Sequence, residues 1–231
     1  PLPPLEIQDQ IVSELENYQK VINGARAVVE SWKPSFDIDP KWEIVKLADV
    51  SKMVRGPFGG SLKKEIFKPS GYLVYEQYHA INDDFSFERY FIDEKKFQEM
   101  KRFEVFAGDV LVSCSGTMGK IAIVPENYKK GIINQALLKL TPNKQKILGQ
   151  YLKHVLESEP IQQKHFRNQS GVAIPNVASV NVLSQIAIPL PLLEIQNQIV
   201  AKIEEEQKIV EANKKLIGIM EQKISNVLSE I

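Results

Sequence analysis

Hydrophobic residues recur at helical spacing towards both ends of the chain and in shorter, strand-like runs between them. The spacing of apolar positions behind a Pro-Leu-Pro-Pro stop predicts a helix over residues 5–31. A longer helix is predicted over 193–231, where isoleucine or valine recurs every seven residues. Residues 32–41 are predicted to be a linker, because Pro34 and Pro40 cannot continue a helix.

The middle of the chain alternates short apolar runs with turns that contain glycine or proline, which is typical of a strand-rich domain. Strands are predicted at 42–47, 72–75, 110–112, 120–124 and 134–140. The Gly116-Thr117-Met118-Gly119 segment predicts a hairpin between two of these strands. A helical region is predicted over 145–167, with Pro160 in the first turn of its second helix. The pattern therefore predicts an α+β fold, with a mixed, strand-rich globular domain over 42–188 and helical segments at 1–31 and 189–231.

The two helical segments begin with nearly the same sequence. Residues 1–20 and 189–208 align without a gap at an offset of 188 and share 13 identical residues. We call these segments the first repeat and the second repeat. A repeat on both sides of a globular domain predicts that one structural task is carried out at two places. That task is interpreted as spacing and partner docking.

The predicted helices each carry a seven-residue apolar seam. The seam positions are Leu15, Ile22 and Val29 in the first helix and Ile203, Val210, Ile217, Ile224 and Ile231 in the last. A neighbouring series in the last helix is apolar only at its ends, which is typical of a coiled coil of limited length and fixed register. The alternative is an ordinary amphipathic helix packed on its own domain. A seam without a partner in its own chain would predict a homodimer formed through these helices.

Composition excludes several classes of protein. Hydrophobic residues make up 43% of the chain, enough for a packed core, so the chain is not disordered throughout. One cysteine, Cys114, excludes an intramolecular disulfide and a cysteine-rich zinc site. No run of apolar residues is long enough to span a membrane and no signal segment is recognisable. A soluble, cytoplasmic protein without a membrane partner is the expectation.

The net charge of zero hides an asymmetry along the chain. Residues 41–188 hold 21 basic and 15 acidic residues, whereas the remaining segments hold 8 basic and 14 acidic ones. A basic domain between acidic helices indicates a polyanionic partner. An excess of six charges is also common on ordinary surfaces, so this signal alone does not decide the partner.

The repeated Pro-Leu-Pro-x-Leu-Glu-x-Gln-x-x-Ile-Val segment around a variable block resembles the specificity subunit of type I restriction-modification systems. Within the block, 54–63 is similar to the opening loop of a target recognition domain. Residues 108–120 and 134–137 are similar to its central strands, and 170–189 to its closing segment. The resemblance covers nearly the whole chain, and its specificity lies in the order of these pieces.

The resemblance implies a non-catalytic subunit in which two recognition domains, each followed by a conserved helix, read the halves of a split DNA sequence. It further implies partners: an adenine-N6 methyltransferase subunit, which supplies the S-adenosylmethionine chemistry, and an endonuclease or translocase subunit. With one recognition domain, this chain is expected to be one half of such a subunit, the second half. The alternative is a natural half-sized subunit that dimerises.

Reading double-stranded DNA requires cations for phosphates and side-chain amides, hydroxyls or guanidinium groups for base edges. The predicted DNA-contacting residues lie in three loops: Arg55, Lys63 and Lys64 beside the glycine-rich loop; Tyr75, Gln77, Tyr78 and His79 after a strand; and Lys164, Arg167, Asn168, Gln169 and Ser170 before the closing loop. Tyr75 and Tyr78 have an alternative role as cover for the edge of the core. Surface lysines often contact nothing specific.

No catalytic residue, metal site or cofactor is predicted in this chain. Residues 116–120 depart from a phosphate loop, because Cys114 stands where that motif needs glycine and Ile121 where it needs a hydroxyl group. The three histidines lack metal-ligand spacing, and no glycine-rich nucleotide motif follows a strand. Three alternatives stay open: a helical assembly protein that does not read DNA, an enzyme with an unrecognised site, and the specificity chain of a related type II system.

Overall fold

The computed structural model describes residues 3–167 and 179–229 and divides the chain into two compact units. The globular unit spans residues 36–200, and the helical unit combines the chain up to residue 35 with the chain from 201 onward. This α+β architecture, with a helix near each end, confirms the predicted fold class. The globular unit extends beyond the expected 42–188, because Phe36, Ile199 and Val200 pack on its hydrophobic core.

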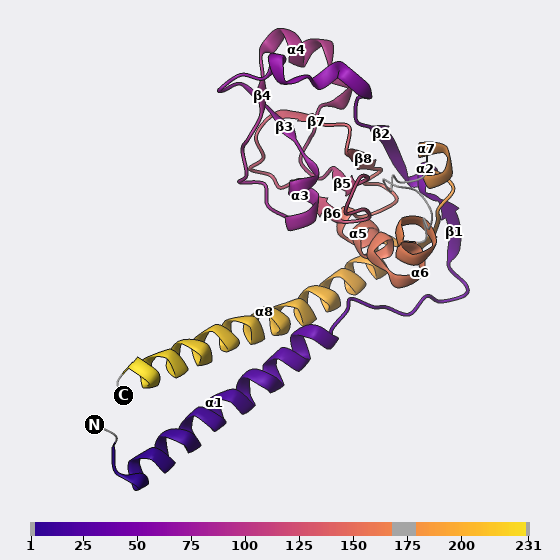
Figure 1. The fold of residues 1–231 in the computed structure, drawn as a ribbon. Coiled ribbons are helices and arrows are strands. Elements are labelled where there is room, and N and C mark those ends of the chain that lie inside the picture. The colour runs from indigo at the N-terminus through magenta and orange to yellow at the C-terminus, as the bar shows by residue number, and fades with distance from the viewer. Residues whose placement is uncertain (1–2, 168–178, 230–231) are drawn as a thin grey trace. The chain divides into compact units, whose positions relative to one another are not determined.

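The globular unit is built on short strands and short helices (Figure 1). Its strands are β1 (Glu43–Lys46), β2 (Ser51–Arg55), β3 (Tyr72–Tyr75), β4 (Phe91–Ile92), β5 (Val110–Ser113), β6 (Ile121–Ile123), β7 (Gly131–Ile133), β8 (Leu137–Pro142) and β9 (Ala187–Leu190). Its helices are α2 (Leu47–Val50), α3 (Gln77–Asn82), α4 (Glu94–Glu99), α5 (Gly149–Glu157), α6 (Glu159–Gln162) and α7 (Val180–Leu183). Tighter turns, η1 to η3, occupy 59–62, 64–66 and 101–103, and a π-helical turn, η4, occupies 163–167.

The strands form three sheets. One is antiparallel, with the order β2-β8-β5-β6, and a second has the order β4-β3-β7, in which β3 and β7 run parallel. β1 pairs with β9. The largest hydrophobic cluster joins the antiparallel sheet to α5 and to the beginning of the last helix, α8 (Leu193–Ser229). Segments distant in sequence therefore build one core, as expected for a domain with its own interior.

All five predicted strands are confirmed: β3 has the predicted limits, and the limits of the other four are shifted. β5 and β6 form the predicted hairpin. β8 begins at Leu137 and not at 134, because Asn134 starts a turn in which its side chain accepts a hydrogen bond from the Ala136 backbone at 3.0 Å. The predicted 145–167 region contains α5, α6 and η4, and Pro160 lies in the first turn of α6, as predicted.

In the helical unit, α1 (Leu5–Ser31) and α8 run antiparallel side by side (Figure 1). The Trp32 indole donates a hydrogen bond to the Glu206 carboxylate at 3.1 Å, and Arg26 lies 3.5 Å from Glu221. The premise that the seam has no partner within its own chain was therefore wrong. Glu206 lies in the neighbouring seven-residue series of the last helix, which is apolar only at its ends. Its hydrogen bond to Trp32 explains why one position of that series is polar.

Burial follows the seven-residue pattern in both helices. Ile22, Ile203 and Val210 are buried, and Leu15, Val29, Ile217 and Ile224 are half-buried; Ile231 lies outside the described residues. Ala25 is buried as well and lies between seam positions. The seam residues thus point inward, and their role in binding a partner stays a prediction. In the part of the chain that the structure describes, no helix is long and apolar enough to cross a membrane.

Candidate nucleic-acid interface

The glycine-rich loop after β2 is fixed at its base. The Gly56 backbone N–H donates to the Leu137 carbonyl at 2.9 Å. A Cβ atom at residue 56 would stand 1.8 Å from the Asn134 carbonyl oxygen, so only glycine allows this close approach of two backbones. Gly56 and Pro57 are buried, whereas the next residue, Phe58, is exposed. The loop therefore presents a side chain from a firmly held base.

Arg55, the last residue of β2, reaches the end of β5. Its guanidinium group donates a hydrogen bond to the Cys114 carbonyl at 3.4 Å. Burial raises the pKa of the Cys114 thiol to about 11, although the nearby Arg55 acts against this shift. The thiol is therefore protonated at neutral pH and is not an activated nucleophile. Lys63 and Lys64 are exposed, and the Lys63 side chain packs close to Gly60.

Two predicted DNA contacts, Tyr75 and His79, are fully buried and are core residues instead. The Tyr75 hydroxyl donates to the Lys129 carbonyl at 2.5 Å. The His79 Nε2 atom lies 3.0 Å from the Phe87 carbonyl, and its Nδ1 atom lies 3.0 Å from the Glu76 backbone nitrogen. Both side chains have their polar atoms bonded inside the unit, so neither has surface left to contact DNA.

The other two members of that run differ from their neighbours. Tyr78 is partly exposed and stacks near Phe87, with 4.1 Å between ring centroids. Gln77 is half-buried, and its Oε1 atom is buried without a hydrogen-bond partner among the described residues. Its amide lies next to Gly116, since a Cβ atom there would be 3.9 Å from Nε2. Gln77 thus has an unpaired acceptor beside the hairpin turn, and that oxygen is covered by its surroundings.

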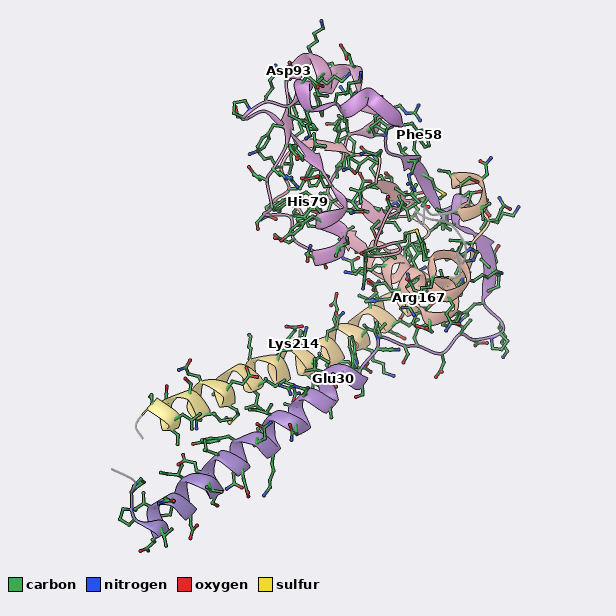
Figure 2. All side chains as sticks on the ribbon, viewed as in Figure 1. Glu30, Phe58, His79, Asp93, Arg167 and Lys214 are labelled. Carbon is green, nitrogen blue, oxygen red and sulfur yellow. The ribbon has the colours of Figure 1, made fainter. Side chains whose placement is uncertain are left out.

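The third predicted loop begins in η4 with Lys164 and Arg167 (Figure 2). The Arg167 guanidinium donates to both oxygens of Glu159, at 2.8 and 3.0 Å, and both side chains are exposed. Asn168, Gln169 and Ser170 lie outside the described residues. η4 abuts the hairpin turn, because a Cβ atom at Gly119 would stand 2.7 Å from Phe166, and Gln162 donates to the Gly119 carbonyl at 2.9 Å.

Each of the three predicted runs therefore has one residue at the same turn between β5 and β6, residues 114–119. Arg55 bonds to its first residue, Gln77 lies against Gly116, and η4 packs on Gly119. Gly116 and Gly119 have φ of 63° and 73°, which favours glycine and lets the turn bend sharply. The sequence predicted the hairpin but not its place as the meeting point, because that depends on contacts between distant segments.

A groove next to this cluster was also missed by sequence reasoning. It has a volume of about 800 Å³, and its lining includes Arg55, Phe58, Lys96, Arg102 and Phe103. Two aromatic rings and three cations face a single carboxylate, that of Glu99, which pairs with Lys96 at 3.1 Å. The sequence feature that could have indicated this groove is Phe58, a single aromatic residue within the glycine-rich loop.

One pair of titratable groups on α5 has displaced pKa values. Burial lowers the pKa of His154 to about 4 and raises that of Glu157 to about 7. His154 is therefore neutral at pH 7, and its 3.9 Å approach to Glu157 is not an ion pair there. His154 is buried and neither residue lines the groove. Among the described residues, no cluster of three or more metal-ligating side chains occurs.

Known proteins share this sequence pattern and fold. The EcoBI specificity subunit of a type I restriction enzyme from Escherichia coli is 26% identical over 133 residues, which cover 58% of this chain and 28% of that protein. The MjaVIII specificity subunit from Methanocaldococcus jannaschii is 24% identical over 265 aligned positions, covering 95% of this chain and 60% of that protein. This chain thus spans less than two thirds of either relative.

The crystal structure of the HsdS subunit from Thermoanaerobacter tengcongensis has the same fold, with a TM-score of 0.62 and 20% sequence identity. The match covers all of this chain and 59% of that one. The family model described as type I restriction modification DNA specificity domain matches residues 40–227. That match takes in the whole cluster around the 114–119 turn and most of α8. The chain therefore belongs to the family of type I restriction modification DNA specificity domains.

Proposed function

We propose that the globular unit reads one half-site of a split DNA target and directs a separate methyltransferase to it. The observation that carries this proposal is the meeting of Arg55, Gln77 and η4 at the 114–119 turn. The Arg55 guanidinium group and the Gln77 amide, whose buried oxygen has no hydrogen-bond partner among the described residues, both lie at this turn. Guanidinium and amide groups are the kinds of group that contact phosphates and base edges. The chain's role is recognition, and the methylation and cleavage reactions belong to partner subunits.

The two repeats support a second recognition domain that would bind at the first repeat. In the second repeat, Gln196 donates to the Pro191 carbonyl at 2.9 Å and also bonds to residues 146 and 148 of the globular unit. In the first repeat, Gln8 donates to the Pro3 carbonyl at 2.7 Å in the same local arrangement. Its surroundings are open: Val12 is 53% exposed, whereas the equivalent Val200 is 9% exposed.

The first repeat is thus an exposed copy of a motif that, in the second repeat, is covered by the globular unit. The exposed copy could bind another domain of the same kind. That domain would come from a longer polypeptide or from a second copy of the chain. The exposed faces of the paired helices would dock the methyltransferase subunit, and through the complex the endonuclease subunit. Both partners, and the cytoplasmic location, follow from the family resemblance.

The test is co-expression of this chain with the methyltransferase subunit, followed by mapping of methylated adenines. We expect one split motif that is absent without this chain. Gln77→Ala is expected to relax or change one position of the motif, whereas Lys64→Ala lowers methylation of the same motif uniformly and reduces the salt slope of binding by about 1. A stable complex that methylates no motif would contradict half-site reading and favour an assembly protein.

The ion pair between Arg167 and Glu159 leads to a separate prediction. Glu159→Gln removes the carboxylate that holds the guanidinium group, so Arg167 becomes available to a phosphate. We expect DNA affinity at low salt to rise by about twofold to fivefold, and Arg167→Ala to lower it by a similar factor. Fluorescence anisotropy with a labelled duplex measures both. Equal affinities for both variants and the wild type would exclude Arg167 as a contact.

A further inference from the structure

Phe58 is the most exposed large apolar side chain among the residues that the structure describes. Its relative exposure is 80%, compared with 49% for Phe106 and 39% for Tyr78. Single exposed apolar residues are common and need no special explanation. Two independent features distinguish this one: the rigidity of the loop that carries it and the charges around it.

Phe58, labelled in Figure 2, is exposed on a loop whose base is fixed. Gly56 is clamped against the Asn134 backbone, and Pro57 beside it is buried. After Phe58, its own carbonyl accepts a hydrogen bond from the Ser61 hydroxyl at 3.0 Å. Because the backbone on both sides of the ring is held, less backbone entropy is lost when the ring binds, which favours its use as a contact residue.

The groove beside Phe58 combines flat aromatic surface with positive charge. The Arg102 guanidinium lies 5.0 Å from the centre of the Phe103 ring, and both line the groove with Phe58. Lys63 and Lys64 follow in the chain a few residues later and are exposed. An apolar protein partner would not need these cations. A stacked base flanked by phosphates matches both features.

We propose that Phe58 is a wedge that inserts at a base step of the bound duplex and stacks on a nucleobase, with the surrounding cations on the adjacent phosphates. The inference rests on the proposed DNA-reading function and adds to it a deformation of the target. Inserted apolar side chains partially unstack a base step and kink the duplex. Sequence preference then depends on how easily that step unstacks, in addition to direct contacts with base edges.

The experiment uses this chain in complex with the methyltransferase subunit and a duplex that carries the mapped motif. 2-Aminopurine is placed in turn at each position of the half-site. With the wild type we expect fluorescence to rise at one or two adjacent positions. Phe58→Ala is expected to abolish that rise and weaken motif binding about tenfold, without changing the salt slope. Phe58→Trp is expected to retain binding.

Phe106→Ala is the matched control, because it removes the next most exposed phenylalanine of the same unit. It is expected to leave fluorescence and affinity unchanged. If Phe58→Ala binds and perturbs the duplex as the wild type does, the wedge is excluded. The same holds if the variant loses only its affinity for the methyltransferase subunit. If the wild type shows no salt-dependent binding, the proposed function fails and the wedge fails with it.

Discussion

Asp109→Asn is expected to lower the free energy of unfolding of the globular unit by about 3–5 kcal/mol. Asp109 is 1% exposed and accepts hydrogen bonds from the Phe106 backbone at 2.8 Å and the Thr141 hydroxyl at 2.5 Å. Its carboxylate also lies 3.5 Å from the buried ammonium group of Lys139. Asparagine keeps the shape but leaves that ammonium group without this counter-charge. Urea denaturation monitored by circular dichroism measures the loss.

A second Asp→Asn substitution on the same unit provides the control. Asp83 pairs with Lys153 at 3.0 Å but its side chain is 55% exposed, and its φ of 50° is one that asparagine adopts readily. Asp83→Asn is expected to cost less than about 1 kcal/mol. The double variant Asp109→Asn/Lys139→Met should recover part of the lost stability, because no buried charge then remains unpaired. Equal losses for Asp83→Asn and Asp109→Asn would contradict this account.

The periodicity of apolar residues predicted the helices near both ends of the chain, but it did not predict which strands pair in the globular unit. α1 was predicted from residue 5 to 31 and is found at Leu5–Ser31, because its apolar spacing and proline stop are local signals. β7 was missed, since its three residues are recognisable as a strand only beside β3, to which they pair in parallel from about 58 positions away. Parallel pairing leaves no turn signal between the two strands.

The DNA-contacting residues were predicted from the polar and aromatic composition of three runs, and the burial of two of these residues in the structure shows that they belong to the core. The run from 75 to 79 is equally polar and aromatic whether it faces solvent or folds back as a helix. In the structure this run crosses from β3 into α3: Tyr75 ends β3 and His79 lies in α3, and both are buried, whereas Gln77 and Tyr78 are nearer the surface. Phe58 was not among the predicted contacts, because the loop around it was interpreted through its glycines and the neighbouring cations. That the loop holds Phe58 from a fixed base becomes recognisable only from the close contact between the Gly56 and Asn134 backbones.

Gln196→Ala is expected to lower the free energy of unfolding by about 2–4 kcal/mol, which is large for an uncharged residue. Gln196 is fully buried and joins three backbone groups: its Oε1 accepts from Leu148 at 2.9 Å, and its Nε2 donates to Lys146 and Pro191, both at 2.9 Å. Alanine would leave the Leu148 N–H and the Lys146 carbonyl without the partner they have here. The loss should appear in thermal and urea denaturation alike.

Gln8→Ala is the matched control, since Gln8 occupies the same place in the first repeat. Gln8 is more exposed and makes one comparable bond, to the Pro3 carbonyl, so the expected cost is below about 0.5 kcal/mol. Equal costs for the two glutamines in this chain would show that the repeat sequence, and not the globular unit docked on it, determines the stability. In a complete two-domain assembly the cost of Gln8→Ala should rise towards that of Gln196→Ala. A second recognition domain would there bury Gln8 and bring the backbone partners that it lacks here.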